Sequence, residues 1–347
     1  MAAGSLFSIM MIIAALTSFA AGRLADRMGR KAVLISGLSF LALGFGAAGV
    51  TGDSLLFFFF LALTGVGYGL TPPSLYAIMS DLLPHRRGLG ASLVSVSYGI
   101  GGAVGAVLAS RIIAAFGWRV AFVTIGGIAG LDMLLQLFWI RNIQSIRRAS
   151  RSGSFKEALT ASISILALAE FIGGSVFWSS AAWTPTLLRT AKSLTLQETG
   201  LLMGVLSLAN MFGSFLLGSL SDRLGRKQVI ALSAFPAALA AFIVFYWLES
   251  LPALAVGIFV FGTLKASVPA LVVALAQESA PPGSAGTASG IIMSLHYTSG
   301  VVAPLIAARL ITDINDIISA MILMCSVPLI LYASLISALQ ERGYLKA

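Results

Sequence analysis

Eleven long apolar runs constrain the fold of this 347-residue chain more than any other feature. They cover residues 4–21, 32–50, 54–83, 90–116, 119–140, 158–187, 199–217, 228–248, 252–279, 285–311 and 317–339. A helix needs about 20 mostly apolar residues to cross the hydrocarbon core of a bilayer, and the runs meet or approach that length. A transmembrane β-barrel would show alternating polarity, whereas these runs are continuously apolar. We therefore predict an all-α polytopic membrane protein with 11 transmembrane helices.

The composition supports this class and excludes others. The chain is 58% hydrophobic and 10% charged, whereas soluble globular proteins average about 45–50% apolar and about 25% charged. Its single cysteine excludes a disulfide scaffold. The sequence offers no metal-ligand cluster, phosphate-binding loop or nucleophile–base pattern, and 2 histidines are too few for most such sites. We expect no enzymatic activity, no metal and no cofactor.

The positions of the basic residues predict the orientation in the membrane. Sixteen of the 22 Lys and Arg residues fall in alternate connections, beginning with the one after the first run. Positive charge collects on the cytoplasmic side of membrane proteins, so these connections and the C-terminus are expected in the cytoplasm. The net charge of +9 is thereby explained by topology, and nucleic-acid binding is not expected. The predicted location is the cell inner (cytoplasmic) membrane, with multiple passes through the lipid bilayer.

A sequence repeat divides the chain into two halves. Residues 22–31 read GRLADRMGRK and residues 218–227 read GSLSDRLGRK, at an offset of 196 residues. Many secondary transporters are built from such repeats, with the substrate bound between the halves. We predict a bundle of five spans over 1–140, a basic cytoplasmic linker over 141–157 and a bundle of six spans over 158–347.

The repeated pattern G-x-L-x-D-R-x-G-R-K resembles the signature of the major facilitator superfamily, and the resemblance covers essentially the whole chain. It implies two pseudo-symmetric six-helix bundles and transport by alternating access. In that family the signature joins helices 2 and 3, and helices 8 and 9. The chain would then supply the equivalents of helices 2 to 12. The first bundle is expected to be short by a helix, through a misplaced start codon, a gene fragment or real loss.

The resemblance also implies a gate at the repeated motif. Asp26 and Asp222 would each grip the cytoplasmic end of a helix from the other half, which holds the outward-facing state closed inside. The glycines allow sharp turns and close approach. In the alternative interpretation, the basic residues of the motif merely set topology. The predicted gating set is Gly22, Asp26, Arg27, Gly29, Arg30, Gly218, Asp222, Arg223, Gly225 and Arg226.

Two departures from the family count against a drug/proton antiporter. Leu61 stands where drug exporters of the superfamily carry an arginine, in an R-x-x-Q-G pattern. The antiporter signature G-x-x-x-G-P is incomplete as well, since the cluster of Gly99, Gly101, Gly102 and Gly105 has no proline. These glycines are better explained by close helix packing.

Ionisable residues inside the apolar runs are the candidate site. A charge at the bilayer centre costs about 2.5–3.5 kcal/mol even on the translocon scale, so such residues tend to be functional. Glu170, Lys265 and His296 lie near the middle of their runs, and the family equivalents of these spans border the central cavity. Lys265 either anchors an anionic substrate or forms a structural ion pair with Glu170. Asp132 lies off centre and is expected to be structural.

His296 is interpreted either as a group protonated near neutral pH or as a satisfied polar contact beside Tyr297. The aromatic residues expected to line the path are Tyr68, Tyr76, Trp178 and Trp183, the last with an alternative place in the interfacial belt. The predicted substrate-binding set has six residues: Lys265, Glu170, His296, Tyr297, Tyr68 and Trp178. We predict a monomeric secondary active transporter of a small solute, an organic anion, coupled to a proton or a counter-substrate. The alternatives are an exporter of hydrophobic compounds and a transport-inactive truncated family member.

Overall fold

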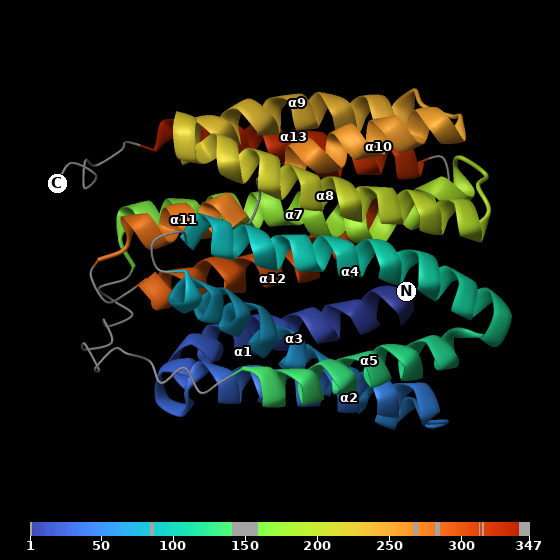
Figure 1. The fold of residues 1–347 in the computed structure, drawn as a ribbon. Coiled ribbons are helices and arrows are strands. Elements are labelled where there is room, and N and C mark those ends of the chain that lie inside the picture. The colour runs from blue at the N-terminus through green and yellow to red at the C-terminus, as the bar shows by residue number, and fades with distance from the viewer. Residues whose placement is uncertain are drawn as a thin grey trace.

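The computed structural model in Figure 1 describes residues 2–83, 87–140, 159–266, 270–281, 285–311, 313 and 316–339, and its regular elements are all helices. The helices are α1 (Ala2–Met28), α2 (Arg30–Val50), α3 (Ser54–Leu82), α4 (Arg87–Phe116), α5 (Trp118–Trp139), α7 (Ala161–Thr190), α8 (Leu196–Leu224), α9 (Arg226–Tyr246), α10 (Leu251–Lys265), α11 (Ala270–Ser279), α12 (Ala285–Leu310) and α13 (Asp316–Ala338). The predicted all-α fold class is confirmed.

The helices match the predicted membrane spans. Within the described residues, 10 helical segments are long and apolar enough to cross a membrane, and α10 with α11 forms one of them, Leu251–Ser279. The remaining predicted span falls on α1, whose apolar stretch Ile9–Ala21 is shorter. Large side chains such as Phe138 and Trp139 stay exposed on the outer surface. A lipid environment explains these exposed rings, because it solvates apolar side chains that water would not.

Glycine makes the turn in both copies of the repeated motif. Gly29 lies between α1 and α2 with φ 86°, and Gly225 lies between α8 and α9 with φ 89°. Only glycine adopts this region without strain from a Cβ atom. The sharp turns expected at these two positions are therefore present, and they occupy equivalent places in the two halves.

Two groups of helices pack within themselves and meet along two helix pairs. In the first group α2 packs against α3 and α5; in the second α7 packs against α12 and α13, and α8 against α10. The groups meet where α1 packs against α12 and α4 against α8. Figure 1 shows α9 and α13 at one side of the view and α2 and α5 at the other, with α4, α7, α8 and α12 between them.

Two of the four clustered glycines on α4 explain how closely it approaches α8. A Cβ atom added at Gly99 would lie 2.3 Å from Cβ of Met211, and one at Gly102 would lie 3.2 Å from Cβ of Ser207. Cβ atoms added at Gly101 and Gly105 would meet no atom within 4 Å. The packing interpretation therefore applies to Gly99 and Gly102, which bring the two groups of helices into contact.

Candidate functional site

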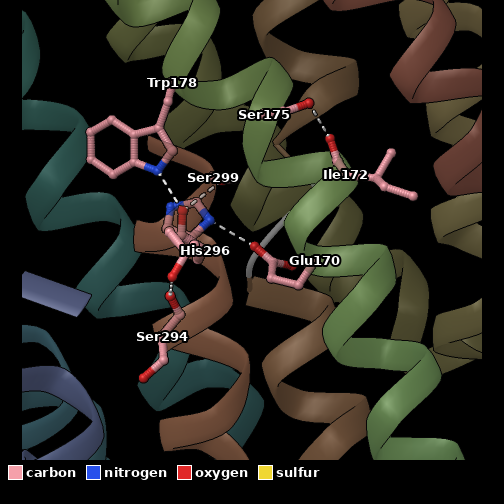
Figure 2. Close-up of polar contacts among 8 residues, drawn as sticks. Glu170, Ile172, Ser175, Trp178, Ser294, His296 and Ser299 are labelled. Carbon is pink, nitrogen blue, oxygen red and sulfur yellow. Dashed lines mark hydrogen bonds and ion pairs between the residues drawn. The ribbon is translucent and has the colours of Figure 1, made fainter. Parts of the chain in front are cut away.

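A carboxylate and an imidazole meet between α7 and α12 (Figure 2). Nδ1 of His296 lies 2.7 Å from Oε1 of Glu170. Glu170 is 0% exposed and His296 is 4% exposed. The second carboxylate oxygen, Oε2, has no hydrogen-bond partner among the described residues. Both residues were predicted from their depth in apolar runs, but their pairing was not.

Trp178 fastens α7 to α12 at this pair. Its Nε1–H donates to the backbone oxygen of His296 at 2.9 Å, and the hydroxyl of Ser299 donates to the same oxygen at 2.6 Å. The indole also lies on Gly300, where an added Cβ would be 3.0 Å from Cγ of Trp178. The backbone that carries the imidazole is thereby held against α7.

Lys265 is a buried cation at the end of α10, 4% exposed. Its Nζ donates to Oγ of Ser180 at 3.1 Å, and lies 4.7 Å from the ring centroid of Phe177 and 5.6 Å from that of Phe261. No carboxylate among the described residues lies within 4.0 Å of it. Glu170 bonds to His296 instead. The expected alternative, an ion pair between Lys265 and Glu170, is not formed in this conformation.

Aromatic rings connect the cation to the Glu170–His296 pair. The Phe177 ring contacts both Lys265 and His296: its centroid lies 4.7 Å from Nζ of Lys265 and 5.4 Å from the imidazole centroid. Tyr68 of α3 contributes from the first half: its ring centroid is 5.7 Å from that of Tyr297 and 6.4 Å from that of Trp178. The six predicted site residues thus lie in one neighbourhood of α3, α7, α10 and α12, with Phe177 joining Lys265 to the rest.

Phe177 and Ser180 are the contacts that sequence reasoning missed. A signal for them existed in the spacing. Residues seven apart lie on the same face of a helix, two turns along, so Phe177 shares a face with Glu170. Ser180 lies one turn further on the same side. Neither residue stands out by type, because phenylalanine and serine are common in apolar helices.

The other flagged residues lie outside this neighbourhood or serve packing. Trp183 donates from Nε1 to the backbone oxygen of Pro304 at 3.1 Å, a second tie between α7 and α12. The hydroxyl of Tyr76 lies 3.5 Å from that of Ser95. Asp132 accepts from Nε2 of Gln136, one turn along its own helix, at 3.2 Å.

The second copy of the motif makes contacts within its own half. Asp222 is exposed, with 60% of its side chain accessible, and its Oδ1 lies 3.7 Å from Arg226. Arg226 also pairs with Glu278 of α11 at 2.7 Å. Arg223 is exposed at the end of α8, and Gly218 lies on the same helix. The interhelical grip expected of Asp222 stays a prediction.

The lysines of the two motif copies make equivalent bonds. Nζ of Lys31 donates to the backbone oxygen of Leu137 at 2.8 Å, and Nζ of Lys227 donates to that of Leu339. Each lysine therefore binds the chain at the end of the last helix of its own group. Arg30 donates to the backbone oxygen of Ala77 in α3. The surroundings of Gly22 and the side chains of Asp26 and Arg27 are not described, so the expectations for these residues stay predictions.

Helices of membrane-spanning length, in two joined groups around a buried polar site, define a polytopic membrane transporter. The family comparison agrees: the model of the Major Facilitator Superfamily matches residues 1–338, and the chain belongs to that family. The resemblance seen in the repeated motif is confirmed. Membership indicates a transporter and not an enzyme, as expected.

Among characterised relatives, the chain is 28% identical to the gentisate transporter of Corynebacterium glutamicum over 84% of its length and 68% of the relative's. It is 25% identical to the gallate transporter of Pseudomonas putida, over 66% of its length and 59% of the relative's. It is 28% identical to the 4-hydroxybenzoate transporter PcaK of Acinetobacter baylyi, over 64% of its length and 56% of the relative's. The matched regions thus span between about half and about two thirds of these relatives.

Proposed function

We propose that this protein is a secondary active transporter that moves a small aromatic carboxylate across the cytoplasmic membrane by alternating access. The names of three relatives support this substrate class, because gentisate, gallate and 4-hydroxybenzoate are all benzene rings bearing a carboxylate and hydroxyl groups. At these identities the relatives indicate a class of solute and leave the particular acid open.

The observation that carries the proposal is the environment of Lys265. Its ammonium is buried and has no carboxylate within 4.0 Å among the described residues, so its positive charge lacks an ion-pair partner, and a carboxylate that bonds to it gains about 1.5–3 kcal/mol. The rings of Phe177 and Phe261 lie beside the ammonium, and Trp178 and Tyr68 lie beyond Phe177. Aromatic faces and edges attract an aromatic solute in offset or edge-on geometry.

The site supports alternating access because it is closed to solvent in this conformation. Lys265, Glu170 and His296 are all buried. A solute reaches Lys265 only after the helices around it separate. The repeated motif and the pairs α1–α12 and α4–α8 are the proposed places of that movement. The excess of basic residues in alternate connections supports a cytoplasmic C-terminus.

The test is binding of gentisate to the purified full chain and to three variants. Lys265→Gln should weaken binding about 10- to 150-fold, the equivalent of the lost charged hydrogen bond. Lys265→Arg should retain part of the affinity, because it keeps the charge. The matched control is Lys192→Gln, in the connection between α7 and α8, which should bind as the wild type does.

Folding of the same variants separates an anchor from a scaffold. Since Lys265 has no carboxylate partner among the described residues, Lys265→Gln breaks no salt bridge and should stay folded. Loss of folded Lys265→Gln protein, rescued by adding Glu170→Gln, would favour the structural ion pair. Unchanged gentisate binding by a folded Lys265→Gln variant would contradict the anchor role of Lys265.

A further inference from the structure

We propose that the Glu170–His296 pair takes up one proton when an aromatic carboxylate binds at Lys265, so that proton and anion are carried together without net charge. This inference rests on the proposed function, because it needs an anion at Lys265. It assigns the site within the protein at which a coupled proton is held.

The first step is a count of buried charge. Among the described residues, the buried members of the Asp, Glu, Lys, Arg and His types are Glu170, Lys265 and His296. With an ionised glutamate, a protonated lysine and a neutral histidine, the sum is zero. A bound carboxylate makes it negative by one charge. An uncompensated charge in a buried site is strongly destabilising, and one added proton restores neutrality.

The second step is that the pair has room for this proton. The 2.7 Å distance between Nδ1 and Oε1 fits a neutral imidazole that donates Nδ1–H to the carboxylate. Oε2 of Glu170 then remains an acceptor without a hydrogen-bond partner among the described residues. A proton taken from water can bond to Oε2, or to Nε2 of His296, without breaking the existing hydrogen bond. The product is a carboxylic acid or an imidazolium, and the pair changes from one negative charge to none.

The third step is that the pair and the anchor share one low-dielectric neighbourhood. Both contact the Phe177 ring: Nζ of Lys265 lies 4.7 Å from its centroid, and the imidazole centroid of His296 lies 5.4 Å from it. Little water screens charges in such a site, so a charge placed at Lys265 acts on the pair more strongly than it would in solvent.

Other titratable groups near Glu170 do not replace the pair as proton acceptor. Tyr332 of α13 and Tyr76 of α3 are within electrostatic reach of the carboxylate, but a tyrosine is already protonated at neutral pH. The remaining charged side chains described on α7 and on the helices packed against it, α8, α11, α12 and α13, lie near helix ends: Arg189, Glu198, Asp222, Arg223, Glu278, Arg309 and Asp316.

The test is calorimetric titration of the full chain in detergent with gentisate, in phosphate and in Tris. These buffers differ in ionisation enthalpy, so the difference in heat counts the protons exchanged on binding. Gentisate's own carboxyl is already ionised at pH 7, as carboxyl groups are. The wild type should take up about one proton per gentisate, because one charge has to be balanced.

Variants assign the proton to the pair. Glu170→Gln should bind gentisate with no proton uptake, since Lys265 and the anion then balance each other. If this variant fails to fold, Glu170→Gln combined with His296→Gln replaces it, because two amides keep a hydrogen bond without an ionisable group. The control is Glu249→Gln, in the exposed connection between α9 and α10, which should take up a proton as the wild type does.

The possible negative results distinguish the proton coupling, its assignment to the Glu170–His296 pair and the proposed function. Gentisate binding by the wild type with equal heat in both buffers would overturn the proton coupling and leave the proposed function standing. Full proton uptake by the folded double variant, Glu170→Gln with His296→Gln, would overturn the assignment to this pair. Absence of binding heat with gentisate, gallate and 4-hydroxybenzoate alike would overturn the proposed function, and this inference with it.

Discussion

Trp178 shows how one side chain can set the geometry of a site without an ionisable group of its own. Its indole N–H holds the backbone oxygen of His296, and its ring covers Gly300. The imidazole can meet Glu170 only while α12 stays at this distance from α7. Trp178 is therefore a positioning residue for the pair.

Replacing Trp178 by phenylalanine tests this role at the residue scale. Trp178→Phe removes the N–H donor and keeps an aromatic ring, so stability should fall by about 0.5–1.5 kcal/mol. Gentisate affinity should fall several-fold, because the His296 imidazole is then held less firmly in position. Trp183→Phe is the control, because it loses a similar bond, to Pro304, further along the same helix pair. It should lower the melting temperature without changing the dissociation constant; equal affinity losses in both variants would contradict the positioning role.

The sequence indicated the candidate residues but not their contacts. Glu170, Lys265 and His296 stand out because each is polar in an apolar run. Which of them pair depends on how α7, α10 and α12 are rotated about their axes, and packing of ordinary residues decides that rotation. Phe177 is such a residue, and its place beside Lys265 follows only from the packed structure.

At the scale of elements, the spans were predictable and their irregularities were not. The run 252–279 was expected to form one span, and the structure describes it as α10, which ends at Lys265, and α11, which begins at Ala270, with 267–269 outside the described residues. Lys265 lies in the last turn of α10, where the helix dipole favours a cation.

Two glycines on α4 provide a matched test of the contact with α8. Gly99→Ala places a Cβ 2.3 Å from Cβ of Met211, whereas Gly101→Ala places one in open space. Both changes gain the same helix propensity, so the comparison isolates packing. Gly99→Ala should be less stable than Gly101→Ala by about 1–3 kcal/mol, the usual cost of overpacking. Equal melting temperatures would show that α4 and α8 are not packed this closely in the membrane protein.

At the scale of the whole molecule, the proposed alternating access requires the two groups of helices to move relative to each other. Residues at the beginning of α8 and near the end of α4 pack tightly, since a Cβ at Gly200 would lie 2.8 Å from Cβ of Ser110. Sequence analysis predicted two bundles through the repeated motif. It could not predict which conformation the bundles adopt, because one sequence must support every state of the cycle. The division at 141–157 stays a prediction, as that segment lies outside the described residues.

A reversible cross-link tests whether this end of the interface must open. Ser110→Cys with Gly200→Cys, in a background where the buried Cys325 is replaced by alanine, should form a disulfide after the helices separate slightly, because Cβ atoms in disulfides are about 3.5–4.5 Å apart. Gentisate transport should stop on oxidation and return with dithiothreitol. Each single cysteine variant should be unaffected by either treatment. Full transport by completely cross-linked protein would show that this end stays joined throughout the cycle.

The bonds of Lys31 and Lys227 have a consequence for assembly. Each lysine lies at the start of the helix that follows the motif turn, α2 or α9. It bonds that helix to the end of the last helix in its own group, at Leu137 or Leu339. Neither hydrogen bond joins residues on opposite sides of 141–157, so cleavage of the chain in that segment would break neither bond. The two polypeptides made separately, 1–140 and 158–347, should each close on themselves in the bilayer and then find each other through α1–α12 and α4–α8. The molecule would in that sense be a heterodimer whose subunits happen to be translated as one chain.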